Sequence, residues 1–232
     1  KGNPWTPQGF PLNLHDIPKL TNNIDNKPMK CLHIITPVKD SIDSTLETVK
    51  AIMESDILVP FTYTVYNDFS TEENTHRLEE AARQWNFRLV NLSDLTDHPS
   101  PNYLLVLQTA QKEAIEADAG LLIVESDVIV KKNTLQSLYN GALQQKQCGI
   151  AAAVTTDEKG VINYPYLHAK GHENQVYPEK KHCSFCCSLL TPGLLKAFDF
   201  QTLDPSKNWY DVTISHESLK RGFQNYLFTT LP

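Results

Sequence analysis

Short apolar runs and longer stretches of helical periodicity alternate along the first half of the chain. Residues 31–36 (CLHIIT) form an apolar run that ends before Pro37, which is typical of a buried strand. In residues 46–53, apolar side chains then recur at helical spacing, and Ser41 or Asp43 can cap the start of that helix. The pattern therefore predicts a strand followed by a helix.

The same unit recurs downstream. Residues 61–66 are rich in β-branched and aromatic side chains and predict a second strand, and residues 72–85 predict a charged helix. A short strand over 87–90, a helix over 104–117 and an apolar strand over 121–124 complete the series. Strands that alternate with helices in this rhythm predict one α/β domain, with a mainly parallel mixed sheet flanked by helices.

The flanking regions are less regular. Residues 1–30 contain five prolines and no sustained period, so we expect an irregular N-terminal arm. Residues 150–232 are expected to complete the sheet, with a strand over 183–190, a flexible loop over 168–182, and a last helix that stops at Gly222.

Composition narrows the classes of function. The net charge of −6 argues against a nucleic-acid partner, which would require a basic face. The longest apolar runs are too short to cross a bilayer, no secretory signal is visible, and the odd count of five cysteines does not suggest a disulfide framework. A cytoplasmic protein is expected. The chain does not begin with Met, so we also expect its N-terminus to be trimmed.

An acidic triplet follows the apolar strand over 121–124. If the chain stays extended, Glu125 and Asp127 point to one side and Ser126 to the other. Two carboxylates close to apolar residues are costly without a cation, and paired oxygen ligands suit Mg²⁺ or Mn²⁺. The alternative is an ordinary acidic turn in which Asp127 caps the next element.

Two other predicted strands also end in polar segments. The first leads into residues 36–40, and the second into residues 66–71 (YNDFST), where Asp68 can accept a hydrogen bond from a nucleobase or a ribose hydroxyl. The alternative is a helix cap by Ser70 or Thr71. Ligands bind at the carboxyl ends of parallel strands, so these segments and the acidic triplet are expected to share one site.

Together, residues 35–40 (ITPVKD), 65–71 (VYNDFST) and 124–127 (VESD) resemble, in order and spacing, the three signatures of family-2 glycosyltransferases of the GT-A fold. The similarity extends from about residue 31 to the end of the chain. The chain departs from the usual residues of these signatures at four positions: Lys39, Asn67, Phe69 and Glu125.

This resemblance implies a nucleotide-sugar-binding half over 31–130 and an acceptor-side half over 131–232 that is truncated at its C-terminus. The donor is expected to be a nucleotide-diphosphate sugar, in the first place a UDP-sugar, and the acceptor a carbohydrate or a lipid-linked sugar. Mn²⁺ or Mg²⁺ is the implied cofactor, and peripheral contact with the inner face of a membrane is also expected.

The resemblance also implies roles for single residues. Asp127 is expected to bind the metal, and Glu125 the ribose or the metal with its water. The residues expected to line the nucleotide site are Thr36, Pro37, Val38, Asn67, Asp68, Glu125 and Ser126.

Asp211 is the candidate catalytic base. It lies near the start of the helix that stops at Gly222, in the position where the resemblance places the aspartate that deprotonates an acceptor hydroxyl in an inverting transfer. The alternative is that Asp211 only caps this helix, since a carboxylate is favoured in a first turn.

Other interpretations remain open. His182, Cys183, Cys186 and Cys187 are compatible with zinc, although structural zinc sites use two separated ligand pairs. A degenerate, non-catalytic binding domain is a second possibility. A sugar nucleotidyltransferase is a third, but it would need a glycine- and arginine-rich phosphate loop, and residues 36–43 contain neither residue type.

Overall fold

The computed structural model of the chain describes residues 29–231. The expected irregular arm over 1–30 therefore lies almost wholly outside the described residues. Met29 already belongs to the folded domain: it is 4% exposed, and its carbonyl accepts a hydrogen bond of 2.7 Å from the Tyr139 hydroxyl.

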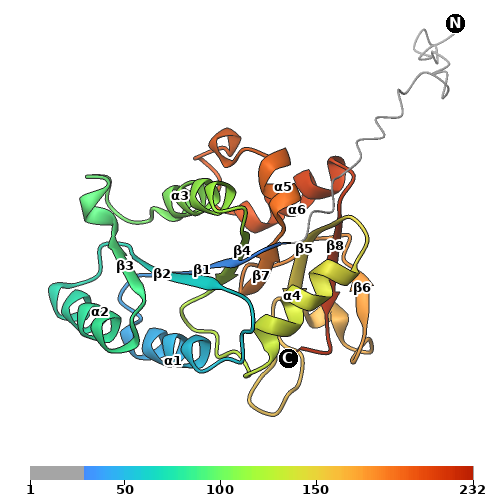
Figure 1. The fold of residues 1–232 in the computed structure, drawn as a ribbon, viewed down its shortest axis with the longest axis horizontal. Coiled ribbons are helices and arrows are strands. Elements are labelled where there is room, and N and C mark those ends of the chain that lie inside the picture. Colours follow the sequence, from blue (N-terminus) through green and yellow to red (C-terminus); the bar gives the residue numbers. More distant parts are fainter. Residues whose placement is uncertain (1–28, 232) are drawn as a thin grey trace, which may run out of the picture.

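A single eight-stranded sheet forms the centre of the molecule, with strand order β3-β2-β1-β4-β7-β5-β8-β6 (Figure 1). The strands are β1 Leu32–Val38, β2 Phe61–Asn67, β3 Arg88–Asn91, β4 Gly120–Val124, β5 Cys148–Ala153, β6 Val176–Pro178, β7 Cys187–Leu190 and β8 Gln224–Phe228. β1, β2, β3 and β4 run parallel, β7 is antiparallel to both β4 and β5, and β6 is antiparallel to β8. The predicted α/β class and mainly parallel mixed sheet are confirmed.

Six α-helices cover the two faces of the sheet in the described residues. They are α1 Ile42–Met53, α2 Glu72–Trp85, α3 Tyr103–Glu116, α4 Thr134–Gln144, α5 Pro192–Ala197 and α6 Tyr210–Lys220. In Figure 1, α1, α2 and α4 lie below the sheet, and α3, α5 and α6 lie above it. Short 3-10 turns occur at Leu92–Asp94, Leu167–Ala169 and Phe200–Thr202.

Alternation along the strands divides the core between these two faces. Ile34 and Leu122 point into the cluster formed with α1, α2 and α4, whereas their neighbours Ile35 and Ile123 point into the cluster formed with α3, α5 and α6. Val124, the last residue of β4, belongs to the first cluster. Glu125, the next residue, is therefore directed toward α3 and α6.

Several predicted boundaries are wrong. β1 runs to Val38 rather than ending at residue 36, because its last three residues pair in register with β2. The expected loop over 168–182 contains β6, which pairs with β8. The last helix does end as predicted, since Gly222 follows it with φ +84°, a conformation that glycine adopts without strain.

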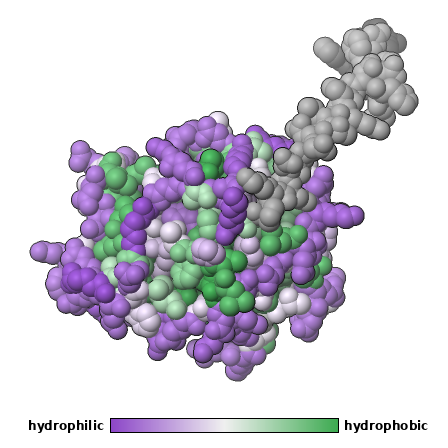
Figure 2. All heavy atoms as spheres, viewed as in Figure 1, coloured by the Kyte–Doolittle hydropathy of each residue, from purple (hydrophilic) through white to green (hydrophobic). Residues whose placement is uncertain are grey.

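Charged and polar side chains cover most of the surface face seen in Figure 2, with a smaller apolar area in its lower middle. None of the helices described over residues 29–231 is long and apolar enough to cross a membrane.

Candidate functional site

The acidic triplet forms a tight turn directly after β4. The Val128 N–H donates to the Glu125 carbonyl at 3.2 Å, and residues 126 and 127 form the turn. The expectation of an extended segment with Glu125 and Asp127 on one side is therefore wrong, because the chain reverses as soon as its pairing with β1 and β7 ends. Glu125 is half-buried, Ser126 is partly exposed and Asp127 is exposed.

Two other carboxylates, those of Asp127 and Asp211, are the charged neighbours of Glu125. Glu125 is anchored next to β7, since its N–H donates to the Cys186 carbonyl at 3.0 Å. Asp127 belongs to the same turn, and Asp211 comes from the first turn of α6 on the face toward which β4 directs Glu125. Both aspartates lie close enough for their charges to act on Glu125. The fold thus brings the predicted metal ligands and the predicted base together from positions more than 80 residues apart.

The electrostatics of Glu125 reflect this crowding. Burial raises the pKa of its carboxyl above the ordinary value, a hydrogen bond from the Cys186 thiol lowers it, and the charges of Asp127 and Asp211 raise it again. Within residues 29–231, none of the ion pairs involves these three carboxylates. A cluster of negative charge without a cationic side chain favours a bound cation.

Asp211 does not act as the N-cap of α6. The N-cap position is Trp209, which makes no side-chain cap hydrogen bond, and the Asp211 carboxylate accepts from the Val212 N–H at 2.8 Å. The capping interpretation is therefore borne out in part: Asp211 is not the N-cap residue, but its carboxylate accepts from a first-turn N–H, where a negative charge is favoured. The other carboxylate oxygen of Asp211 has no hydrogen-bond partner among the described residues.

Tyr103 is a site residue that the sequence analysis missed. It begins α3, its ring packs on Tyr210 with centroids 6.3 Å apart, and its hydroxyl is buried without a hydrogen-bond partner among residues 29–231. Burial raises the pKa of this hydroxyl well above its ordinary value, and the charges of Glu125 and Asp211 raise it further. The hydroxyl therefore lies beside the carboxylates as an unused donor.

Replacing Tyr103 with phenylalanine is expected to stabilise the ligand-free protein. An unsatisfied buried polar group costs about 1–3 kcal/mol, so its removal should raise the melting temperature by a few degrees. Tyr139→Phe is the matched control, because its hydroxyl is satisfied by Met29 and its loss should lower the melting temperature. A lower melting temperature for Tyr103→Phe would show that the hydroxyl has a partner in solution.

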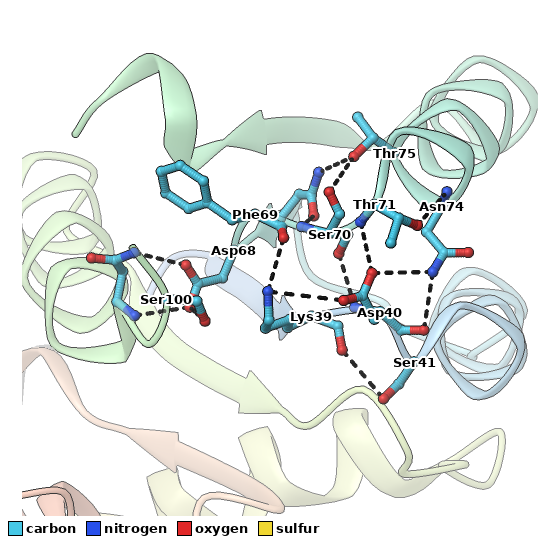
Figure 3. A network of polar contacts seen from close by, with 12 residues as sticks. Lys39, Asp40, Ser41, Asp68, Phe69, Ser70, Thr71, Asn74, Thr75 and Ser100 are labelled. Atoms are coloured by element: carbon cyan, nitrogen blue, oxygen red, sulfur yellow. Dashed lines mark hydrogen bonds and ion pairs between the residues drawn. The ribbon is translucent and has the colours of Figure 1, made fainter. Parts of the chain in front are cut away.

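Asp68 lies at the end of β2 and is 8% exposed. Its carboxylate accepts three hydrogen bonds of 2.8 Å each, from the Ser100 hydroxyl, the Asn102 N–H and the Asn102 side-chain amide (Figure 3). These bonds fix the start of α3 and hence Tyr103. Asp68 is thus engaged in organising the site, and a contact with the nucleotide stays a prediction.

Asp68→Ala should therefore destabilise the fold as well as the site. It leaves the buried Asn102 N–H without its acceptor, which costs about 1–3 kcal/mol, while the Asn102 side-chain amide keeps the His98 carbonyl as its remaining acceptor. Thermal unfolding, together with amide hydrogen exchange over residues 100–105, measures both effects. Asp97→Ala, which removes an exposed carboxylate from the same loop, is the control that should change neither.

Asn67 is also held by the protein. Its side-chain amide donates to the Thr75 hydroxyl and the Asn91 side chain at 2.9 Å each, and its side-chain oxygen accepts from the Ser70 N–H at 3.2 Å. With 3% exposure, Asn67 joins β2, β3 and α2 rather than presenting free polar groups.

The loops after β1 and β2 are tied to each other (Figure 3). Lys39 donates to the Phe69 carbonyl at 2.9 Å, and the Asp40 carboxylate accepts from the Thr71 N–H at 2.7 Å and from the Asn74 amide at 3.2 Å. The Thr71 and Asn74 hydrogen bonds lower the pKa of Asp40 below its ordinary value. Phe69 has φ +57°, a conformation unfavourable for a bulky side chain, so these bonds hold a strained turn.

Thr36, Pro37 and Val38, the three residues of β1 that were predicted to contact the nucleotide, differ in the direction of their side chains. Thr36 is fully buried and its hydroxyl accepts from the Tyr63 hydroxyl at 3.0 Å, while Val38 is 3% exposed within the α1–α2 core. Only Pro37 keeps an exposed surface on the side of α3. For Thr36 and Val38, a nucleotide contact could come only from the backbone, and all three contacts stay predictions.

No group of three or more His, Cys, Asp or Glu side chains in residues 29–231 has the geometry of a complete metal site. Cys183 and Cys187 are buried, and burial and Glu125 together raise the pKa of the Cys186 thiol to about 12. His182 and these cysteines form no group that could hold a metal ion, so the zinc interpretation has no support among the described residues.

Several solved structures have a similar fold. S. aureus TarS 1-349 matches with a TM-score of 0.61 and 17% identity, over 86% of this chain and 58% of that chain. The mannosyltransferase PcManGT from Pyrobaculum calidifontis, in complex with GDP-Man and Mn²⁺, matches with a TM-score of 0.58 and 14% identity, over 87% and 55%. The chain has a GT-A fold. At this level of identity, the likeness concerns the fold alone.

The chain spans little more than half the length of these GT-A proteins. TarS 1-349 in complex with UDP-GlcNAc gives a similar match, with a TM-score of 0.60 and 18% identity over 86% of this chain and 56% of that one. The sequence matches no protein-family model and no curated protein.

Proposed function

We propose that the chain is the catalytic domain of a metal-dependent glycosyltransferase that transfers a sugar from a nucleotide-diphosphate sugar to an acceptor hydroxyl with inversion. The observation that carries this proposal is the convergence of Glu125, Asp127 and Asp211 at the carboxyl ends of the parallel strands of a GT-A fold. The likeness to TarS in complex with UDP-GlcNAc and to PcManGT in complex with GDP-Man and Mn²⁺ supports the donor class.

The donor atoms of the turn fit Mn²⁺ or Mg²⁺. Both available side chains are carboxylates, and Glu125 has a raised pKa partly because negative charge lies beside it, a penalty that a cation would relieve. Asp127 is the better placed ligand because it is exposed, and Glu125 would contribute as the second ligand or through a water. A bound divalent cation would neutralise the charge that develops on the leaving diphosphate.

Asp211 is assigned the role of general base. In the proposed step, an acceptor hydroxyl attacks the anomeric carbon while the bond between that carbon and the diphosphate oxygen breaks. The Asp211 carboxylate takes the hydroxyl proton, and the diphosphate leaves with the bonding electron pair. Attack opposite the leaving group inverts the configuration. The partly free carboxylate of Asp211, on the side of Glu125, supports this assignment.

The bonds among Asp68, Ser100 and Asn102 support a preformed nucleotide site beside this centre. We propose that the donor lies at the carboxyl ends of β1, β2 and β4, with its diphosphate toward the acidic turn. We propose a UDP-sugar as donor, a carbohydrate or lipid-linked acceptor, and peripheral contact with a membrane where the acceptor is lipid-linked.

A turnover assay tests the proposal. The protein is incubated with UDP-GlcNAc, UDP-glucose or GDP-mannose in the presence of Mn²⁺, and release of the nucleoside diphosphate is followed with and without added saccharides. Metal-dependent release that increases with a saccharide, and that yields the inverted anomer by proton NMR, is the expected result. Metal-dependent binding without any release would instead support a non-catalytic binding domain.

A further inference from the structure

A buried hydroxyl without a partner lies at the start of α3. The hydroxyl of Tyr103, the first residue of this helix, is shielded from solvent and makes no hydrogen bond within residues 29–231. Buried polar groups in folded proteins are nearly always paired, and an unpaired one lowers stability. For the fold alone, phenylalanine would therefore be the better residue at this position, and the hydroxyl is a candidate for a role in function.

The place of this hydroxyl is set by the packing of two helix starts. Asn102, the N-cap residue of α3, donates from its N–H and from its side-chain amide to the Asp68 carboxylate, at 2.8 Å each. The Tyr103 ring itself packs on Tyr210 in the first turn of α6, with centroids 6.3 Å apart. Because the ring is held in this way, an acceptor for the hydroxyl has to come to it.

The acceptors beside this hydroxyl are carboxylates. Beyond burial, the charges that raise the pKa of the Tyr103 hydroxyl are those of Glu125 first and Asp211 second. The course of the backbone favours the same residue, since alternation along β4 directs the Glu125 side chain toward α3 and α6. Glu125 is therefore the acceptor that the fold directs at the hydroxyl.

Glu125 is held from the β7 side, and its acceptor capacity is not used up there. Its N–H donates to the Cys186 carbonyl at 3.0 Å, and its carboxylate accepts from the Cys186 thiol. The sulfur of Cys186 in turn lies 3.2 Å from the Ser184 hydroxyl. A carboxylate has about four acceptor positions on its two oxygens, so one thiol leaves room for a second donor. Rotation about the side-chain bonds of Glu125 can bring a free oxygen to the fixed hydroxyl.

From these observations, we infer that Tyr103 is a positioning residue for Glu125: its hydroxyl donates to the Glu125 carboxylate when the acidic turn binds the cation and the donor. The carboxylate is then held between two donors, the phenol from α3 and the Cys186 thiol from β7, and directs its remaining lone pairs at the cation or its water. The hydroxyl is buried and acts only through Glu125. This inference rests on the proposed function and deepens it, because it connects Asp68, which fixes the start of α3, with the acidic turn.

The test measures donor binding and stability in the same variant. Tyr103→Phe should lower the affinity for UDP-GlcNAc or GDP-mannose in Mn²⁺, whichever the wild type binds, by about tenfold or more, because partners that orient metal ligands typically contribute 10–100-fold. It should also raise the melting temperature of the ligand-free protein, whereas loss of a merely structural hydroxyl would lower this temperature and leave donor affinity unchanged. Tyr139→Phe is the matched control, since its buried hydroxyl bonds Met29, and it should keep the donor affinity.

A double mutant identifies the group through which Tyr103 acts. In an Asp211→Asn background, Tyr103→Phe should lower donor affinity by the same factor as in the wild type, because Glu125 is still present. Disappearance of the effect in that background, a donor affinity of Tyr103→Phe equal to that of the wild type, or a lower melting temperature of the ligand-free variant would each overturn the inference. Failure of the wild type to bind any nucleotide sugar in Mn²⁺ would instead overturn the proposed function itself.

Discussion

Asp127→Asn is expected to abolish Mn²⁺-dependent binding of the nucleotide sugar while leaving the fold intact. Asp127 is the exposed carboxylate of the acidic turn and forms no ion pair within residues 29–231, so no folded-state interaction is lost. Without its charged oxygens the turn keeps only Glu125, whose ionised form is already disfavoured by burial. We expect donor affinity in Mn²⁺ to fall by about two orders of magnitude or more, to the level measured in EDTA, in line with the dependence of divalent cations on carboxylate ligands.

Isothermal titration with the donor, in Mn²⁺ and in EDTA, measures this effect, and thermal unfolding checks the fold. Glu47→Gln removes an exposed carboxylate from α1 and is the control for a general loss of negative charge. If Asp127→Asn binds the donor in Mn²⁺ as well as the wild type does, the metal does not bind at this turn.

Asp211→Asn is expected to lower turnover strongly while leaving donor binding nearly unchanged. The asparagine preserves the shape of the side chain and can still accept from the Val212 N–H, but it cannot take a proton. General-base catalysis contributes roughly 10²–10⁴-fold, so we expect kcat to fall by about that factor. Donor affinity should stay within about threefold, because Asp211 lies on α6 rather than in the acidic turn.

Single-turnover transfer, measured alongside donor binding, distinguishes these effects. Glu116→Gln removes an exposed carboxylate from the end of α3, and it should retain kcat. Transfer that survives in Asp211→Asn would exclude this residue as the base and would direct attention to another group at the turn, such as Glu125.

The sequence predicted the fold well because each element carries its own periodic signal. The strand over 121–124 and the helix over 72–85 match β4 and α2 closely, since the first is a short apolar run after Gly120 and the second is a charged segment that follows a turn. β6 was missed because it is three residues long, contains a proline and lies at the sheet edge, where pairing with β8 rather than composition defines it.

The site was predictable at the level of which segments meet, but not of how their side chains point. Because ligands bind at the carboxyl ends of parallel strands, the sequence predicted that residues 36–40, 66–71 and 125–127 lie at one edge of the sheet. It could not show that Val38 faces the core, because the strand was predicted two residues too short, and it gave no orientation for Thr36 at the predicted strand end. Nor could it show that residues 126–127 turn, since an acidic triplet is compatible with both extended and turned backbone.

The proximity of Tyr103 and Cys186 to the carboxylates could not be predicted from the sequence. Both reach the carboxylates through tertiary packing: Tyr103 through the bonds from Asp68 to Asn102, and Cys186 through the pairing of β7 with β4. Tyrosine at a helix start and cysteine in a turn before a buried strand are common in any domain. Asn102 directly before a helix was the one local signal available, and it suggests a cap rather than the link to Asp68 that the structure contains.

The central claim is that the acidic turn and the strand ends beside it bind a nucleotide-diphosphate sugar with a divalent cation. Isothermal titration of the wild type with UDP-GlcNAc, UDP-glucose and GDP-mannose, each in Mn²⁺ and in EDTA, tests it most directly. We predict saturable binding of at least one nucleotide sugar in Mn²⁺ and its loss in EDTA. Binding of none of them in Mn²⁺, or equal binding in EDTA, would contradict the claim.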